Sequence, residues 1–151
     1  MFAPKRILVP TDFSSYSDEA LKKAVDIAKQ YGAKVIILHV VPVAQHWPTG
    51  YALNLDVPTI EDYEAASVKL AQQLIDEQVK KAIGDTDVDF VYEIKSGEPY
   101  EEILSECVRK AIDVIVIASH GRTGVLSHLI GSVALKVAQH AKCPVLLVRA
   151  N

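Results

Sequence analysis

Five short apolar runs, separated by longer segments of mixed polarity, constrain the fold of this chain more than any other feature. Several of the runs are apolar without interruption and rich in valine and isoleucine, which is typical of parallel strands buried on both faces of a sheet. We expect strands at residues 6–10, 34–41, 88–94, 113–118 and 144–148. The run at 88–94 alternates apolar with more polar residues, and this pattern predicts an edge strand.

The segments between the runs have helical periodicity and recognisable helix ends. Gly32 and Gly84 are suited to terminate the first two helices, and Pro99 fits the first turn of the third. We expect helices at residues 17–31, 59–83, 99–110 and 132–141. Alternating strands and helices predict one α/β domain over residues 1–151, with an open, mostly parallel sheet and helices on both of its faces.

The composition fits a single domain and argues against several classes of protein. The chain has 151 residues, of which 50% are hydrophobic, and this is enough for one core. Its formal net charge of -3 gives no electrostatic basis for binding nucleic acid. The apolar runs are far shorter than the ~20 residues of a membrane span, and the amino terminus has no apolar segment of a signal peptide. We therefore expect a cytoplasmic protein without nucleic-acid or membrane partners.

The cysteines and histidines form no recognisable metal-binding pattern. Cys107 and Cys143 are far apart in the sequence and fit neither a Cys-x-x-Cys motif nor a disulfide framework, so we expect buried free thiols. The five histidines lack the paired spacing of a zinc site.

Residues 42–58 form a long stretch without strand or helix signals, which contains Trp47, Tyr51 and three prolines. A loop of this length in a compact domain is usually functional or mobile. Two interpretations remain open. The segment is either a surface excursion whose aromatic residues cover the second helix, or a lid or partner contact.

Small and polar residues follow two of the predicted strands, at the ends where open parallel sheets bind ligands. Thr11 and Asp12 follow the first strand, and a glycine-containing loop follows the fourth. If these two strands are neighbours, the loops meet. Three roles are open for Asp12: it accepts hydrogen bonds from a ribose hydroxyl or adenine amino group, holds a magnesium ion beside phosphates, or orders the turn before the first helix.

The loop after the fourth strand has several properties of a phosphate-binding loop. Gly121 and Gly124 allow the backbone to approach a ligand closely. Gly131 and Ser132 lie at the expected start of the last helix, where free N–H groups and the helix dipole favour an anion. Arg122 is available as a cationic partner. The loop is neither a Walker A loop nor a Gly-x-Gly-x-x-Gly loop, and two glycines alone could simply mark a turn.

Taken together, these features resemble the universal stress protein family over essentially the full chain. The matching stretches are "ILVPTDFS", "LHVV" and "ASHGRTGVLSHLIGSVALKVAQHAKCPVLLVR". The family's nucleotide signature is Gly, two residues, Gly, nine residues, then Gly followed by Ser or Thr. Gly121, Gly131 and Ser132 match this signature, whereas Ala118 stands at the position of the first glycine. The resemblance implies a Rossmann-like fold with strand order 3-2-1-4-5 that binds adenine nucleotides.

Carried over to this sequence, the resemblance implies a set of nucleotide-binding residues. Asp12 would contact the ribose and lie beside a magnesium or manganese ion, and Val40 would meet adenine through its backbone. The full set is Pro10, Thr11, Asp12, Val40, Ile117, Ala118, His120, Gly121, Arg122, Gly131, Ser132 and Val133. His120 either contacts the ligand or braces the turn. Alanine keeps the backbone N–H at position 118, so binding is retained if this residue has negative φ and points its side chain aside.

The last predicted strand suggests self-association. In the implied order, Val145–Val148 would be an exposed edge that is apolar throughout. Antiparallel pairing with a second copy would cover it and give a homodimer, as is common among members of the family. The alternative is that the chain's own terminus or a helix covers the edge.

The implied function is an ATP-binding sensor or regulator of a stress response, with slow or no ATP hydrolysis. One uncertain metal aspartate and one arginine are fewer groups than efficient phosphoryl transfer normally uses. The alternative, favoured by Ala118, is a homodimeric interaction module without nucleotide. An enzyme with Asp12 as nucleophile ranks last, because no second acidic residue accompanies Asp12.

Overall fold

The computed structural model describes residues 1–42, 60–121 and 129–149. The elements in chain order are β1 (Arg6–Pro10), α1 (Ser15–Tyr31), β2 (Lys34–Val41), α2 (Ile60–Ala82), β3 (Phe90–Ser96), α3 (Pro99–Arg109), β4 (Val114–Ala118), α4 (Ser132–His140) and β5 (Val145–Val148). The strands and helices therefore alternate as the sequence predicts. The long predicted loop, except for Pro42, lies outside the described residues.

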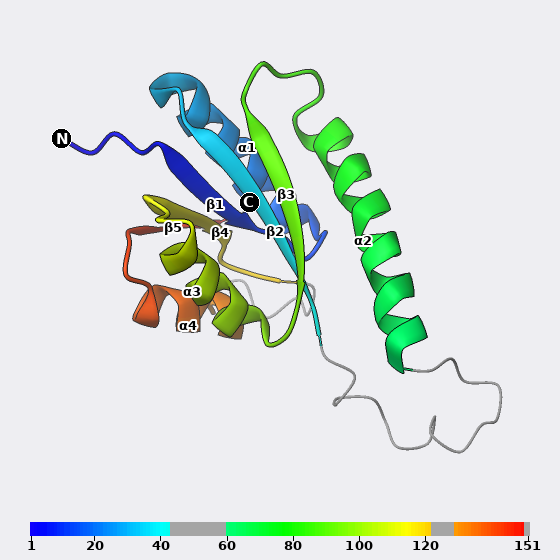
Figure 1. Ribbon diagram of the computed structural model, residues 1–151. Coiled ribbons are helices and arrows are strands. Elements are labelled where there is room, and N and C mark those ends of the chain that lie inside the picture. Colours follow the sequence, from blue (N-terminus) through cyan, green and yellow to red (C-terminus); the bar gives the residue numbers. More distant parts are fainter. Residues whose placement is uncertain (43–59, 122–128, 150–151) are drawn as a thin grey trace.

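The five strands form one parallel sheet in the order β3-β2-β1-β4-β5 (Figure 1), which confirms the predicted topology. β1 lies at the centre, paired with β2 on one side and β4 on the other. Because β2 and β4 continue the chain in opposite directions from β1, the sheet has a topological switch point between β1 and β4. The edges are β3 and β5.

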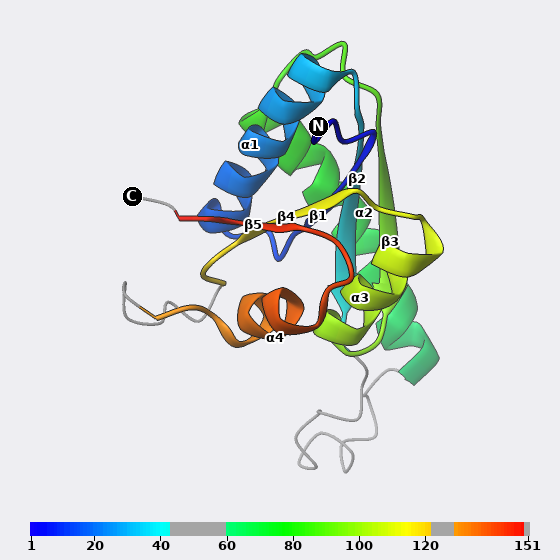
Figure 2. The same cartoon turned by 90° about the vertical axis from the view of Figure 1, so that its left-hand side faces the viewer.

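Helices cover both faces of the sheet, as the continuous apolar strands predict (Figure 2). α1 and α2 pack on one face, and α3 and α4 pack on the other. Successive residues of β1 alternate between the two cores: Ile7 and Val9 face α1, whereas Leu8 faces α3 and α4. All three are fully buried. Burial of each such side chain contributes roughly 1.5–3 kcal/mol, so a polar side chain at any of these three positions would destabilise the fold.

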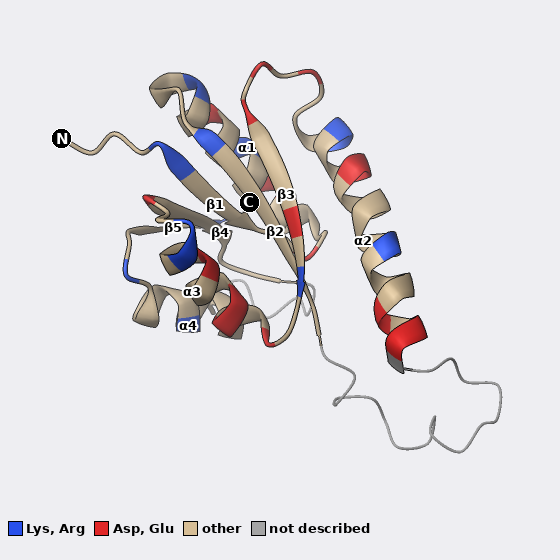
Figure 3. Ribbon diagram, in the orientation of Figure 1, with Lys and Arg blue, Asp and Glu red and all other residues tan. Residues whose placement is uncertain are grey.

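The helix ends follow from local side chains and glycines. The Ser14 hydroxyl accepts a hydrogen bond from the Ser17 N–H at the start of α1, and Gly32 ends this helix with a left-handed φ of 64°. In α2 and α3, acidic residues occupy the first turn and basic residues the last (Figure 3). This arrangement complements the helix dipole.

The third strand is displaced from its predicted position. It runs from Phe90 to Ser96 instead of spanning 88–94, because it pairs along β2 from Val35 as far as Val41. Its alternation is also incomplete, since Val91 and Tyr92 are both exposed. The edge position was correctly predicted, but pairing with the longer β2 set the strand's limits. None of the helices within the described residues combines the length and apolar character needed to cross a membrane.

Candidate functional site

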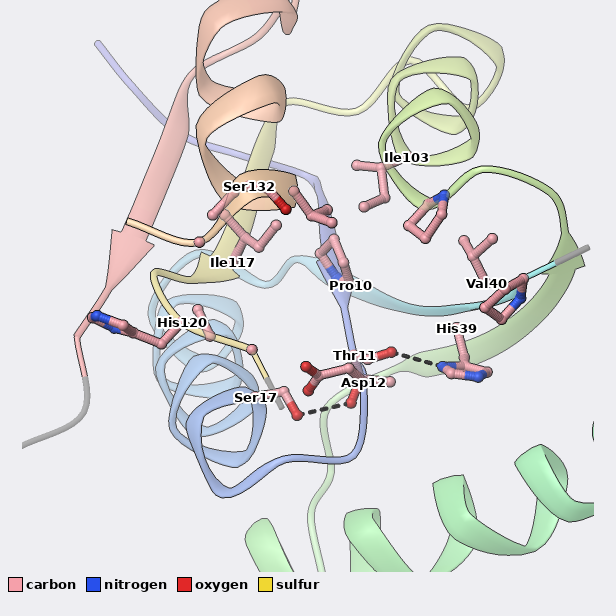
Figure 4. A pocket seen from close by; sticks show the side chains of 17 residues that line it. Pro10, Thr11, Asp12, Ser17, His39, Val40, Ile103, Ile117, His120 and Ser132 are labelled. Carbon is pink, nitrogen blue, oxygen red and sulfur yellow. Dashed lines mark hydrogen bonds between the residues drawn. The ribbon is translucent and has the colours of Figure 1, made fainter. Parts of the chain in front are cut away.

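A cavity of about 430 Å³ opens at the carboxyl ends of β1 and β4, at the switch point of the sheet (Figure 4). This volume is within the range of small-molecule sites, roughly 300–1,000 Å³. The predicted site residues that line it are Pro10, Thr11, Asp12, Val40, Ile117, Ala118, His120, Gly121, Gly131, Ser132 and Val133. Arg122 and Gly124 lie outside the described residues. The two predicted loops therefore meet, because β1 and β4 are neighbours.

The turn between β1 and α1 is held by its own side chains. Asp12 Oδ1 accepts the Ser14 N–H at 3.0 Å, and Thr11 Oγ1 accepts the Phe13 N–H at 3.1 Å. Phe13 adopts a left-handed φ of 65°, which is uncommon for an aromatic residue. Asp12 thus orders the turn, one of the three roles considered for it. This bond also fixes the direction of its carboxylate at the edge of the cavity.

The loop after β4 approaches Asp12 very closely. A Cβ added to Gly121 would lie 2.9 Å from Asp12 Oδ2, so a larger residue at 121 would displace this carboxylate. At Gly131, an added Cβ would come no closer than 3.4 Å to Ser119 O, which is ordinary contact. Glycine at position 121 therefore allows the Asp12 carboxylate to keep its place.

The start of α4 provides donors, although not all of those predicted. The Gly131 N–H donates to Ser119 O at 2.7 Å and so braces the two ends of the loop. Ser132, Val133 and Ala134 follow in the first turn, where backbone N–H groups have no partner within the helix. The anion-binding capacity of this helix therefore begins at Ser132.

Ala118 meets the condition for keeping nucleotide binding with alanine in place of glycine, which is a negative φ and a side chain that points aside. It is the last residue of β4, and the only described non-glycine residues with positive φ are Phe13 and Ala111. Its side chain is 8% exposed and packs in the core beneath α1. The methyl group is therefore directed into the core, and the backbone at 118 keeps the geometry of a strand.

The two histidines near the cavity both brace loops. His120 Nδ1 lies 2.8 Å from Ser119 Oγ, and its ring, close to that of Tyr16, points away from the other labelled side chains (Figure 4). His39 Nδ1 lies 2.8 Å from Thr11 O, and its ring packs against Phe13 at a centroid distance of 4.3 Å. Of the two readings of His120, this geometry favours the bracing role.

A buried polar network, which the sequence analysis missed, supports the floor of the cavity. Gln78 of α2 is 6% exposed and accepts a hydrogen bond from the Thr11 hydroxyl at 2.8 Å. Its Nε2 donates to Asp18 Oδ1 at 2.8 Å and to Ser17 Oγ at 3.1 Å. A glutamine in a long helix full of polar residues gave no signal that it would be buried.

Six further residues line the cavity without having been predicted: Ser17, His39, Pro42, Pro99, Ile103 and Ala134. Four of them come from β2, the residue after it, or the first turns of α3. The carboxyl ends of β2 and β3 lie at the same edge of the sheet as those of β1 and β4, so position alone could have indicated these residues.

The described part of the cavity lining carries little charge. Asp12 is the one acidic residue in this part of the lining, and this part contains no Lys or Arg. Among the described residues, no group of three or more possible metal ligands occurs. Basic residues are instead scattered over the molecule (Figure 3).

A separate buried ion cluster joins β3 to α3. Glu106 is fully buried, with its carboxylate 2.7 Å from Arg109 and 3.6 Å from Lys95. Burial raises the pKa of Glu106, and the neighbouring Glu93 carboxylate raises it further. Burial also opposes the ionisation of Glu93, but its ion pair with Lys110 at 2.7 Å and the other nearby groups hold its pKa below the ordinary value.

The sheet order and the cavity together define the class of protein: a doubly wound α/β protein with a small-molecule cavity at its topological switch point. The sequence model of the universal stress protein family matches residues 4–149, and the chain belongs to this family. A universal stress protein of Methanocaldococcus jannaschii is 35% identical over 147 residues, covering 96% of this chain and 82% of the relative.

Solved structures share the fold. The structure of universal stress protein UspA from Lactobacillus plantarum has a TM-score of 0.80 and 25% identity, with 96% of this chain and 97% of that one covered. A universal stress protein in complex with cAMP has a TM-score of 0.69 at 23% identity, covering 97% and 98% of the two chains. An Arabidopsis thaliana family member with AMP bound has a TM-score of 0.58 at 19% identity, covering 98% and 93%.

Proposed function

We propose that this protein binds an adenine nucleotide, ATP in the first place, in the cavity between β1 and β4 and acts as a sensor or regulator in a stress response. The observation that carries the proposal is the convergence of Asp12, Gly121 and the start of α4 on one cavity of suitable size. The two family members described above with cAMP and AMP support an adenine nucleotide as the ligand.

The backbone of β2 offers a place for adenine. Leu38 O accepts the Thr11 N–H at 2.8 Å, so Leu38 directs its backbone groups toward β1. Backbone groups alternate sides along a strand, so Val40 directs its N–H and C=O the same way, past the end of β1 and into the cavity. A neighbouring donor and acceptor of this kind match the Watson–Crick edge of adenine.

The remaining groups suit a ribose and a phosphate chain. The Asp12 carboxylate accepts hydrogen bonds from ribose hydroxyls, and the first N–H groups of α4 with the Ser132 hydroxyl donate to phosphate oxygens. At Gly121 and Gly131 no side chain keeps the nucleotide away from the backbone. Arg122, outside the described residues, supplies a cation.

A magnesium or manganese ion is compatible with this arrangement. Mg²⁺ at nucleotide sites is held mainly by phosphate oxygens and water, with one or two carboxylates from the protein. Asp12 is the residue that would hold it. When bound, the ion neutralises phosphate charge.

The proposed role is binding rather than catalysis. The groups proposed for the site are a single carboxylate, which already accepts the Ser14 N–H, and one arginine, Arg122, which lies outside the described residues. Efficient phosphoryl transfer combines a fixed metal, a positioned base and cationic clamps. We therefore expect any ATP hydrolysis to be slow.

We further propose a homodimer formed through β5. This strand is an edge of the sheet, and Leu146 on it is 39% exposed. An unpaired apolar edge is an aggregation hazard unless it is covered. Antiparallel pairing of β5 with a second copy covers it in a closed, symmetric assembly.

The test is to purify the protein without added nucleotide, denature it, and identify any released small molecule by chromatography. Calorimetric titration with ATP, AMP and GTP, each with magnesium, follows. We expect adenine nucleotides to bind in preference to GTP. A Gly121→Ala variant places a methyl group 2.9 Å from Asp12 Oδ2 and should weaken binding roughly 10- to 100-fold, the loss of about one hydrogen bond to a charged group.

An unchanged circular dichroism spectrum of Gly121→Ala controls for misfolding. No released nucleotide and no heat with any of the three ligands would overturn the proposal. That result would favour the alternative, a homodimeric interaction module without nucleotide.

A further inference from the structure

Two cysteines that are 36 positions apart in the sequence lie in contact in the fold. Cys107 on α3 and Cys143, between α4 and β5, place their sulfur atoms 2.9 Å apart. Both are free thiols; Cys107 is buried and Cys143 is half-buried. The prediction of buried free thiols is correct for Cys107, whereas Cys143 is free but only half-buried. The separation in sequence gave no sign that the two would meet.

The surroundings of the pair are apolar. Cys107 belongs to the core between the sheet and α3 and α4, and Cys143 packs against this core. Burial raises the pKa of Cys143 to about 12, and the hydrogen bond with Cys107 contributes to the rise. The raised pKa keeps the thiolate fraction of Cys143 small at neutral pH, so its reaction with an oxidant is slow.

A metal site does not explain the pair. Zinc sites use four ligands, or three and a water. Within residues 1–42, 60–121 and 129–149, no group of three or more His, Cys, Asp or Glu residues is placed to hold a metal ion. Two adjacent sulfurs with no third ligand among the described residues are suited to a different chemistry, the formation of a bond between them.

We propose that Cys107 and Cys143 are a site of reversible oxidation, at which a peroxide converts the two thiols of the folded protein into one intramolecular disulfide. The thiolate of one cysteine attacks a peroxide oxygen, the O–O bond breaks, and a sulfenic acid forms. The second sulfur then attacks the sulfenic sulfur, the S–S bond forms, and water leaves. In sum, two thiols and one hydrogen peroxide give one disulfide and two waters. A dithiol reduces the disulfide back to two thiols by exchange and is itself oxidised to a disulfide.

The position of the pair connects it with two other parts of the molecule. Cys107 lies on α3, whose Pro99 and Ile103 line the cavity, and Cys143 lies two residues before β5. A disulfide would tie α3 to the segment between α4 and β5. An effect of oxidation on nucleotide affinity or on dimerisation would rest on the proposed function, whereas formation of the disulfide does not.

The experiment uses the full chain, first reduced with dithiothreitol and then separated from it. Samples with and without hydrogen peroxide are freed of the peroxide, denatured so that the buried Cys107 becomes accessible, alkylated with N-ethylmaleimide and measured by intact mass spectrometry. We expect two adducts on the reduced protein and none on the oxidised protein, whose mass falls by two hydrogens. A digest without reductant should contain one peptide pair joined through Cys107 and Cys143, and dithiothreitol should restore both adducts.

Two variants and a melting curve complete the test. Cys143→Ser changes the half-buried position, and Cys107→Ala keeps an apolar side chain at the buried one; neither should lose two hydrogens with peroxide. Closing a loop of 36 residues should raise the unfolding midpoint of the oxidised wild type by about 5–10 °C, with no rise in the variants. Two adducts after peroxide, added oxygen in place of lost hydrogen, disulfides between chains, or a midpoint that does not rise would each overturn the proposal.

Discussion

Replacement of Gln78 by leucine should lower the free energy of unfolding, because it removes the hydrogen bonds that Gln78 makes with buried residues after β1 and in α1. The Gln78 amide binds three partners: the Thr11 hydroxyl at 2.8 Å, Ser17 Oγ at 3.1 Å and the Asp18 carboxylate at 2.8 Å. Leucine has a similar size but offers none of these bonds. The variant therefore tests whether α2 supports the turn after β1 through hydrogen bonds or only through packing.

The magnitude follows from what each partner loses. Asp18 is 8% exposed and would keep its ion pair with Lys81 at 3.5 Å. The Lys81 side chain is 77% exposed, so this pair contributes little. Loss of a hydrogen bond to a buried charge costs about 1.5–3 kcal/mol, and loss of a neutral one about 0.5–1.5 kcal/mol. Thr11 and Ser17 remain within 3.0 Å of each other and partly compensate. We expect the free energy of unfolding to fall by about 2–4 kcal/mol.

Urea unfolding followed by circular dichroism measures this change, and the unfolding midpoint on heating should fall by roughly 5–15 °C. Gln73→Leu is the matched control, because Gln73 lies on the same helix and is exposed. Its free energy of unfolding should stay within about 0.5 kcal/mol of the wild-type value. A Gln78→Leu variant as stable as the control would refute the reasoning.

Three further predictions concern the cavity, the buried ion cluster and the edge of the sheet. Ser132→Ala should weaken ATP binding roughly 3- to 10-fold in calorimetry, since one hydroxyl donor is lost. Ser105→Ala should not change it, because Ser105 is an exposed residue of α3 that does not line the cavity. Because burial raises the folded-state pKa of Glu106 above its ordinary 4.5, ionisation disfavours the folded state. The wild type should therefore lose stability relative to Glu106→Gln as the pH rises from below 4.5 through the raised pKa, and an opposite trend in urea unfolding would contradict this. Leu146→Glu should convert the proposed dimer to monomer in sedimentation experiments, because Leu146 on the edge strand is 39% exposed.

Much of the fold could be predicted because it depends on local patterns. Continuous apolar runs indicated strands buried on both faces, and their alternation with helices indicated a parallel sheet. The limits of β3 could not be predicted, because they depend on pairing with β2, from Val35↔Phe90 to Val41↔Ser96.

The residues of the two loops could also be predicted, because the carboxyl ends of neighbouring parallel strands meet at one edge. Their interactions could not. The Gly131 N–H was expected to face a ligand, yet it donates to Ser119 O, and this bond exists only when the loop closes on itself. Gln78 and the contact between Cys107 and Cys143 likewise depend on tertiary packing between segments distant in sequence.

Our main proposal is that an adenine nucleotide occupies the cavity between β1 and β4. A crystal structure, from crystals grown with ATP and magnesium, is the most direct test of this proposal. We predict adenine beside the Val40 backbone, ribose on Asp12, and phosphates at the start of α4 near Ser132. Nucleotide density at another place on the molecule would contradict the proposed site, as would a cavity without nucleotide in crystals grown at saturating ATP.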